Sequence, residues 1–319
     1  MYAGKVGRDH LGLGSVSSDQ ILPSLSPSIN VLTFHPRYHS FYVFLLDEFW
    51  QRDLPRTQQT WINFFRPRDF IYSLGANLCS QPEHGEMGNI VGGQKTEPLA
   101  SQQKDVYAYD PEYIVSDLGG YGLYYRSVMA EVGLIYPGGK GFVYPVDVPT
   151  EYGKEVAASF RKVVQNTRYY QHYFDPYKPV PIAVIQEYIH QACLCQLCTD
   201  RAHDRGFLID SFLHHGPKTA AEARRATFRF FLDMVNQTNG FSVDEDAFRQ
   251  LHAQPLRDVA HAGHAVFANL APGPREAFTL IVSPVEVLGD ATNRSMKMKR
   301  SVRGWIRTPC PVGEFLEAY

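Results

Sequence analysis

The chain has 319 residues, of which 44% are hydrophobic and 20% are charged, values typical of a globular protein with a sizeable core. Its formal net charge of −2 provides no overall attraction to nucleic acid or acidic lipid, so any such contact needs a local basic patch. No stretch approaches the ~20 apolar residues of a membrane-spanning helix, and no apolar signal-peptide core follows Met1. The five cysteines are an odd number and do not suggest a disulfide framework, so we expect a cytoplasmic protein without a membrane partner.

The first 110 residues predict an arm followed by aromatic-rich helices. Residues 1–30 are rich in Gly, Ser and Pro and predict an extended arm. In the region 31–110, apolar residues at helical spacing after Pro36 predict a deeply buried helix over 37–50. Two more helices are expected on either side of Pro67, over 57–65 and 69–78, and a long polar loop over 80–110.

The region 111–175 predicts a helix, a β-hairpin and a second helix. The first helix covers 124–132 and ends at Gly133, and strands are expected over 134–136 and 142–148 around a glycine turn. Thr150 can cap a helix that starts at Glu151.

This order of elements resembles the C-terminal half of a winged-helix domain, over about 120–165. The resemblance implies that the first helix can enter a DNA groove and that the hairpin is the wing. Arg126 and Lys140 are then the candidate nucleic-acid contacts. The alternative is a winged helix used for packing or for contact with another protein.

The remaining chain predicts a helical region, 176–251, and a poorly packed C-terminal tail, 252–319. The tail is rich in Ala, Gly and Pro at first and then basic, with Lys297 and Arg300 as further candidate nucleic-acid contacts.

The helical region contains three closely spaced cysteines, Cys193, Cys195 and Cys198. Cys195, Cys198 and His203 are weak zinc candidates, because Cys-x-x-Cys spacing suits a tetrahedral site. There is no second Cys-x-x-Cys, and Cys193 continues an apolar pattern that predicts one helix over 182–195. We therefore expect structural thiols, with no bound metal and no cofactor.

A second constellation lies at the start of the buried helix, where His35, Arg37 and His39 occur together. If the N-terminal arm folded back, Asp9 and His10 would join them, and such a cluster can perform acid–base chemistry. This is the basis of an alternative function, a hydrolase or nuclease.

Several stretches are similar to a group of uncharacterised bacterial proteins associated with defence or mobile-element loci. They are Leu11–Ser17, Leu22–Val31, Arg37–Tyr42, Leu118–Arg126 and the helix with Cys193 and Cys195. The resemblance covers about 8–250 and implies no catalytic residue. It also implies further aromatic helices beyond residue 251, which this sequence lacks, so a truncated or altered C-terminus is a second interpretation of the tail. Together, these observations predict a mainly α, multi-helix globular protein with a winged-helix-like β-hairpin. Its expected function is that of a non-enzymatic accessory or DNA-associated subunit in bacterial defence or regulation, with DNA or a protein of a multi-subunit system as partner.

Overall fold

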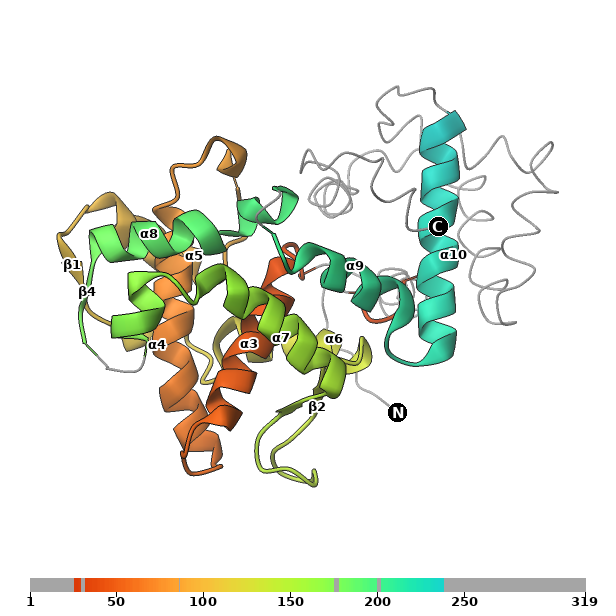
Figure 1. The fold of residues 1–319 in the computed structure, drawn as a ribbon, viewed down its shortest axis with the longest axis horizontal. Helices are drawn as coiled ribbons and strands as arrows, with labels where there is room; N and C mark the ends of the chain where they lie inside the picture. Colours follow the sequence, from red (N-terminus) through yellow and green to blue (C-terminus); the bar gives the residue numbers. More distant parts are fainter. Residues whose placement is uncertain (1–25, 30–31, 86, 175–177, 200–201, 238–319) are drawn as a thin grey trace, which may run out of the picture. The chain divides into compact units, whose positions relative to one another are not determined.

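The computed structural model describes residues 26–29, 32–85, 87–174, 178–199 and 202–237, which are mainly helical as the sequence predicts (Figure 1). The chain divides into two compact units, whose described parts are 32–211 and, separately, 26–29 with 212–237. Most of the predicted arm and the whole predicted tail lie outside the described residues. The helices and strands in chain order are α3 (Arg37–Gln51), α4 (Gln58–Asn77), η2 (Pro82–His84), α5 (Gly93–Ser101), β1 (Val106–Tyr107), η3 (Pro111–Tyr113), η4 (Tyr121–Tyr125), α6 (Arg126–Glu131), β2 (Ile135–Tyr136), β3 (Val148–Pro149), α7 (Glu151–Val164), η5 (Tyr169–Tyr173), β4 (Val180–Pro181), α8 (Ile182–Ala192), η6 (Leu194–Cys198), α9 (Arg205–His214) and α10 (Lys218–Gln237).

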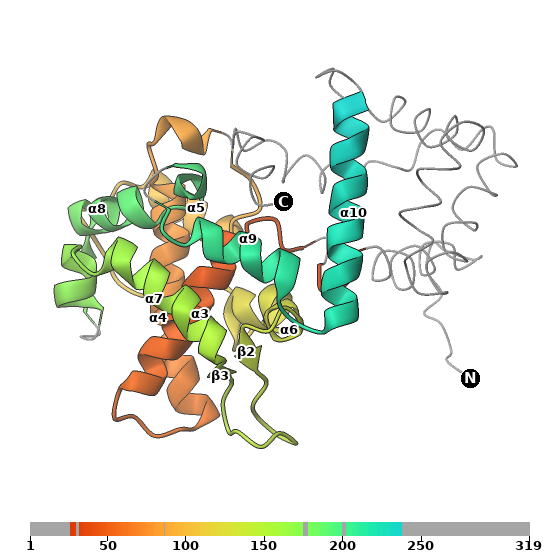
Figure 2. The ribbon, with the colours of Figure 1, turned by 45° about the vertical axis from the view of Figure 1, so that its right-hand side comes forward.

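Helix α3 forms the centre of the larger unit, as predicted. Every residue from Arg37 to Phe49 is buried, because apolar side chains occur on all sides of the helix. It packs mainly against α7, which runs beside it in Figure 2. Aromatic rings fill the contacts, and Phe41 stacks on Tyr72 of α4 with ring centroids 4.0 Å apart.

Helix α4 corrects the prediction of two helices separated by Pro67. It is continuous through this proline, and the side chain of Thr57 caps its start by accepting a hydrogen bond from the Thr60 N–H. A proline inside a helix costs about 3 kcal/mol. Buried aromatic residues on both sides of Pro67, among them Trp61 and Phe70, offset this cost.

The segment 80–110 is not a long loop, which is a second correction. It contains η2, α5 and β1. Helix α5 starts after Gly92, whose φ of 69° is readily adopted only by glycine, and it packs against α4. Gly92 and Gly93 at its start and Pro98 inside it are turn signals, and they concealed the helix.

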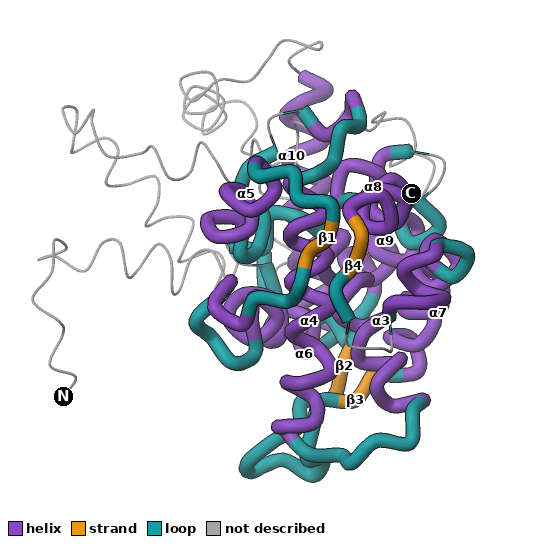
Figure 3. Tube along the Cα trace, turned by 90° about the vertical axis from the view of Figure 1, so that its left-hand side faces the viewer, coloured by secondary structure: helices purple, strands orange, loops and turns teal. Residues whose placement is uncertain are grey.

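The hairpin region is partly as predicted. Helix α6 is preceded by a π-helical turn, η4, and the chain leaves α6 at Gly133, which has a φ of 75°. β2 pairs antiparallel with β3, with Tyr136 opposite Val148 (Figure 3). The predicted strand over 142–148 is wrong except for its last residue. The Gly138 N–H is bound by the carboxylate of Asp147, at 2.6 Å, instead of a partner strand.

Helix α8 is shorter than predicted, and this difference positions the site described below. The helix ends at Ala192, because Cys193 has an extended ψ of 148°. The chain then turns into the 3₁₀-helix η6. Before α8, strand β4 pairs antiparallel with β1.

The smaller unit contains α10, whose buried Arg224 joins it to the segment before α3. The Arg224 Nη1 donates to Ser28 Oγ at 3.1 Å, and Nε donates to the Phe212 carbonyl at 2.6 Å. Among the residues that the structure describes, no helix combines the length and the apolar character needed to cross a bilayer.

Candidate metal centre

Four side chains that could each provide one ligand to a metal ion meet where α4 and α8 end. Cys79 follows the last turn of α4, and His84 belongs to η2. Cys193 and Cys195 follow α8, on the corner that leads into η6. All four ligand atoms lie within 4.8 Å of one another. Among the described residues this is the one group of His, Cys and acidic side chains close enough to share a metal ion.

The distances in this Cys₃His cluster fit tetrahedral coordination. The Sγ atoms of Cys79 and Cys195 are 3.8 Å apart, and the Sγ of Cys193 lies 3.3 Å from Nδ1 of His84. Sulfur ligands about 2.3 Å from a central zinc ion at tetrahedral angles are about 3.8 Å apart. The distance between Cys79 and Cys195 therefore matches one edge of such a tetrahedron, and the other ligand atoms lie within 4.8 Å of these two.

The cysteines of the cluster carry no disulfide. Cys193 and Cys195 are buried, whereas Cys79 and His84 are half-buried. Zinc is held by thiolate and neutral imidazole ligands, and a set of three cysteines with one histidine is typical of structural zinc sites.

Mutual hydrogen bonds shift the pKa values of the cluster. Hydrogen bonds from Cys193 and then Cys79 lower the pKa of the Cys195 thiol, while the hydrogen bond with Cys195 raises that of Cys193. Hydrogen bonds with Cys195 and Cys79 raise the pKa of His84 to about 9. Without a metal the cluster thus favours a thiolate beside an imidazolium. A zinc ion must displace protons from His84 and from the remaining thiols, so metal affinity falls as the pH falls.

The backbone corner that presents Cys193 and Cys195 is held from α3 and α4. Arg37 of α3 donates to the Cys193 carbonyl at 2.6 Å, and Tyr72 of α4 donates to the Ala192 carbonyl at 2.8 Å. The Arg37 guanidinium is fully buried and forms a two-pronged pair with Asp204, each bond 3.2 Å long. Gln196 adds an N–H donor to the sulfur of Cys195, at 3.5 Å. Such outer hydrogen bonds orient metal ligands.

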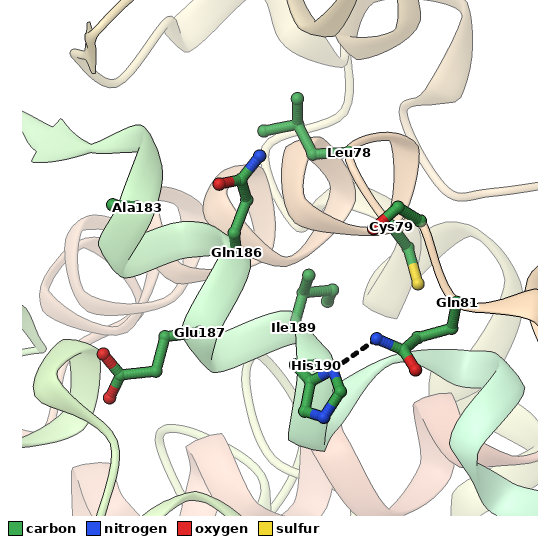
Figure 4. A pocket seen from close by; sticks show the side chains of 9 residues that line it. Leu78, Cys79, Gln81, Ala183, Gln186, Glu187, Ile189 and His190 are labelled. Carbon is green, nitrogen blue, oxygen red and sulfur yellow. Dashed lines mark hydrogen bonds between the residues drawn. The ribbon is translucent and has the colours of Figure 1, made fainter.

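A hollow of about 410 Å³ lies next to the cluster, between the end of α4 and one face of α8 (Figure 4). Cys79 and Gln81 line it from the α4 side, and Gln186, Glu187 and His190 line it from α8. Gln81 and His190 are joined by a hydrogen bond across it. Of the four cluster residues, Cys79 is the one that lines this hollow.

Of the three zinc candidates from the sequence, Cys195 belongs to this cluster and the exposed His203 does not. The 3₁₀-helix η6 ends at Cys198, whose side chain lies outside the described part of the structure. Cys79 and His84 were missed, because they are more than 100 residues away from Cys193 and Cys195 in the chain. The usable signals were a Cys-x₄-His spacing at Cys79 and a Cys-x-Cys spacing at Cys193, but the assumption of one continuous helix through Cys193 obscured the second.

Of the four candidate nucleic-acid contacts, the structure describes Arg126 and Lys140. Arg126 binds both carboxylate oxygens of Asp147, at 2.7 and 2.8 Å, and donates to the Gly138 carbonyl at 2.7 Å. Lys140 is exposed in the connection between β2 and β3. Lys297 and Arg300 lie outside the described residues.

The candidate acid–base residues at the start of α3 make structural contacts. Arg37 donates hydrogen bonds to the Asp204 carboxylate and to the Cys193 carbonyl. His35 Nε2 contacts the Gly88 carbonyl at 2.8 Å, and burial lowers the pKa of His39 to about 4. Asp9 and His10 lie outside the described residues.

The chain matches no protein-family model, no curated protein and no solved structure with which it was compared. The chemistry of the cluster is therefore the main guide to function.

Proposed function

We propose that the protein binds one zinc ion through Cys79, His84, Cys193 and Cys195, and that this ion has a structural role. The observation that carries the proposal is the convergence of four zinc-type ligand atoms within 4.8 Å from two distant parts of the chain. A zinc ion there ties the end of α4 to the corner after α8. Four protein ligands complete a tetrahedron and leave no position for water or substrate, which distinguishes structural from catalytic zinc sites.

A closed structural site favours a non-enzymatic function, that of an accessory or binding subunit. The involvement of Arg37 in the Cys193 corner weakens the alternative of a hydrolase or nuclease, since a fully buried guanidinium is not available to a substrate. A role in bacterial defence or regulation rests on the sequence resemblance alone and stays a prediction.

Zinc content measured on purified full-length protein tests the proposal. We expect about one equivalent of zinc per chain, and we expect the protein to lack the visible colour of an iron–sulfur cluster. Cys79→Ser and His84→Asn should each lower zinc affinity at least about tenfold. Cys198→Ser and His203→Ala serve as controls for the candidates from the sequence, and the exposed His203 lies outside the cluster.

The controls separate the two possible zinc sites. Full zinc content in both controls, with losses in Cys79→Ser and His84→Asn, supports the Cys₃His centre. Loss in Cys198→Ser and His203→Ala with retention in Cys79→Ser would move the site to Cys195, Cys198 and His203. Zinc-free protein that takes up none from a buffered zinc solution would overturn the proposal.

DNA binding through a winged helix is a second candidate function, favoured by the antiparallel β2–β3 pair after α6 and by the exposed Lys140. Arg126 gives less support to DNA binding, because its guanidinium donates hydrogen bonds to Asp147 and to the Gly138 carbonyl. If a duplex binds, Lys140→Ala should weaken binding and lower its salt dependence. Equal binding by wild type and variant at every salt concentration would leave the hairpin a packing or protein-contact role.

A further inference from the structure

The three cysteines of the proposed zinc centre differ in their access to solvent. Cys193 and Cys195 are 0% and 2% exposed. Cys79 is half-buried, and it lines the hollow beside α8, into which a small reagent can diffuse (Figure 4). Oxidation of cysteine follows exposure and thiolate character. Among these three sulfurs, that of Cys79 is therefore the one that a small oxidant reaches first.

The sulfur of the buried Cys195 lies beside that of Cys79. Cys195 Sγ lies 3.8 Å from Cys79 Sγ, and a disulfide bond is about 2.05 Å long, so an approach of about 1.8 Å joins them. Neither cysteine lies within an α-helix, because Cys79 follows the end of α4 and Cys195 lies in the 3₁₀-helix η6. At 3.8 Å, the Cys195 sulfur is placed to attack an oxidised Cys79 sulfur, and the buried Cys193 sulfur lies within 4.8 Å as well.

We propose that Cys79 is a site of oxidation by hydrogen peroxide, resolved by Cys195 into a disulfide that expels the zinc ion. The inference rests on the proposed zinc function. The Cys79 thiolate attacks one peroxide oxygen, the O–O bond breaks, and a sulfenic acid forms while hydroxide leaves. The Cys195 thiolate then attacks the Cys79 sulfur, the S–S bond forms, and the S–O bond breaks with loss of a second hydroxide. The two thiolates supply the two electrons that reduce the peroxide.

The two states join the same segments by different means. In the reduced state zinc links the end of α4 to η6, and in the oxidised state the disulfide links them. Oxidation removes two of four ligands, so Cys193 and His84 alone cannot retain the ion. The disulfide keeps the corner closed, and a dithiol reductant with added zinc restores the starting state.

Hydrogen peroxide added to the zinc-loaded full-length protein tests the inference. A chromophoric chelator follows zinc release, and peptide mass spectrometry without reduction identifies the disulfide. We expect one zinc released for each disulfide, with Cys79 joined to Cys195, and recovery of zinc binding after dithiothreitol treatment. Both measurements use the wild-type chain, so they do not depend on a variant that fails to fold.

Two variants sharpen the test. His203→Ala should release zinc at the wild-type rate, because this exposed side chain lies outside the cluster. Gln186→Trp places a bulky ring at the hollow and should slow release about tenfold or more with zinc content unchanged, because access limits the reaction.

The outcomes distinguish the inference from the zinc proposal. Protein that never binds zinc overturns both. Protein that binds zinc and retains it in excess peroxide, or that forms a different disulfide, overturns only the oxidation of Cys79.

Discussion

The corner at Cys193 and the hairpin at Asp147 are each held by one arginine, and they differ in how far that arginine is removed from water. Arg37 is fully buried, and its guanidinium joins Asp204 to the Cys193 carbonyl. Arg126 keeps 29% of its side chain exposed while it binds Asp147. Charges in the interior must be paired, whereas exposed ones retain water as an alternative partner. The corner is thus the more costly of the two to disturb.

The largest expected effect is that of Asp204→Ala. It leaves the Arg37 charge buried without its carboxylate, and breaking a buried pair in this way costs about 3–5 kcal/mol. Chemical denaturation measures the loss in free energy of unfolding. Asp53→Ala, at an exposed acid, is the matched control and should stay within about 0.5 kcal/mol of wild type.

The same variant also tests the link between the corner and the metal centre. Because Arg37 orients the Cys193 carbonyl, Asp204→Ala should weaken zinc binding as well as stability. A loss below about 1 kcal/mol, with zinc affinity unchanged, would show that the corner does not depend on this ion pair.

Removal of zinc should have the next largest effect. A ligand present at 100 to 1,000 times its Kd stabilises the folded state by about 2.7–4.1 kcal/mol. Chelation should therefore lower the melting temperature of wild type and leave that of Cys79→Ser almost unchanged. An equal shift in both proteins would mean that the chelator acts elsewhere.

Acid should weaken zinc binding for a related reason. Hydrogen bonds with Cys195 and then Cys79 raise the pKa of His84 to about 9 in the metal-free state, against the lowering effect of burial, so its imidazole carries a proton at neutral pH. Zinc must displace this proton, and each displaced proton lowers the affinity about tenfold for every pH unit below the pKa. Zinc titrations over the range from about pH 8 to about pH 6 measure how the zinc affinity changes with pH. A pH-independent affinity would exclude His84 as a ligand.

A smaller effect is expected at the hairpin. Arg126→Ala removes three hydrogen bonds but leaves Asp147 bound to Tyr121 and to the Gly138 N–H, so the expected loss is about 1–2 kcal/mol. Zinc content should not change. A loss as large as that of Asp204→Ala would remove the distinction between the two regions.

The smallest effect is expected at the tip of the hairpin. The side chain of Val143 is 93% exposed, so Val143→Ser should change the free energy of unfolding by less than about 0.5 kcal/mol. A larger loss would show that this side chain is covered in solution, and analytical ultracentrifugation would then reveal whether a second copy covers it.

Much of the fold follows from local sequence pattern. The apolar residues around α3 predicted its burial, and Thr150 predicted the start of α7, where its Oγ1 accepts from the Gly153 N–H at 2.9 Å. Pro67 misled because burial on both sides of α4 outweighs a local helix-breaking preference. Local pattern predicts well where neighbouring residues decide the outcome.

The candidate site could not be predicted in the same way. Its ligands come in two pairs, Cys79 with His84 and Cys193 with Cys195, and only the packing of α4 against α8 brings the pairs together. The break of α8 at Cys193 also depends on tertiary contacts, since Arg37 and Tyr72 bind the carbonyls that a longer helix would have used.

X-ray absorption at the zinc edge tests the central claim most directly, because it identifies the atoms around the metal. We predict three sulfur neighbours at about 2.3 Å and one nitrogen at about 2.0–2.1 Å in the protein purified with its metal. His84→Asn should lose the nitrogen contribution, and Cys79→Ser should lose one sulfur. A shell of oxygen and nitrogen atoms without sulfur would contradict the account.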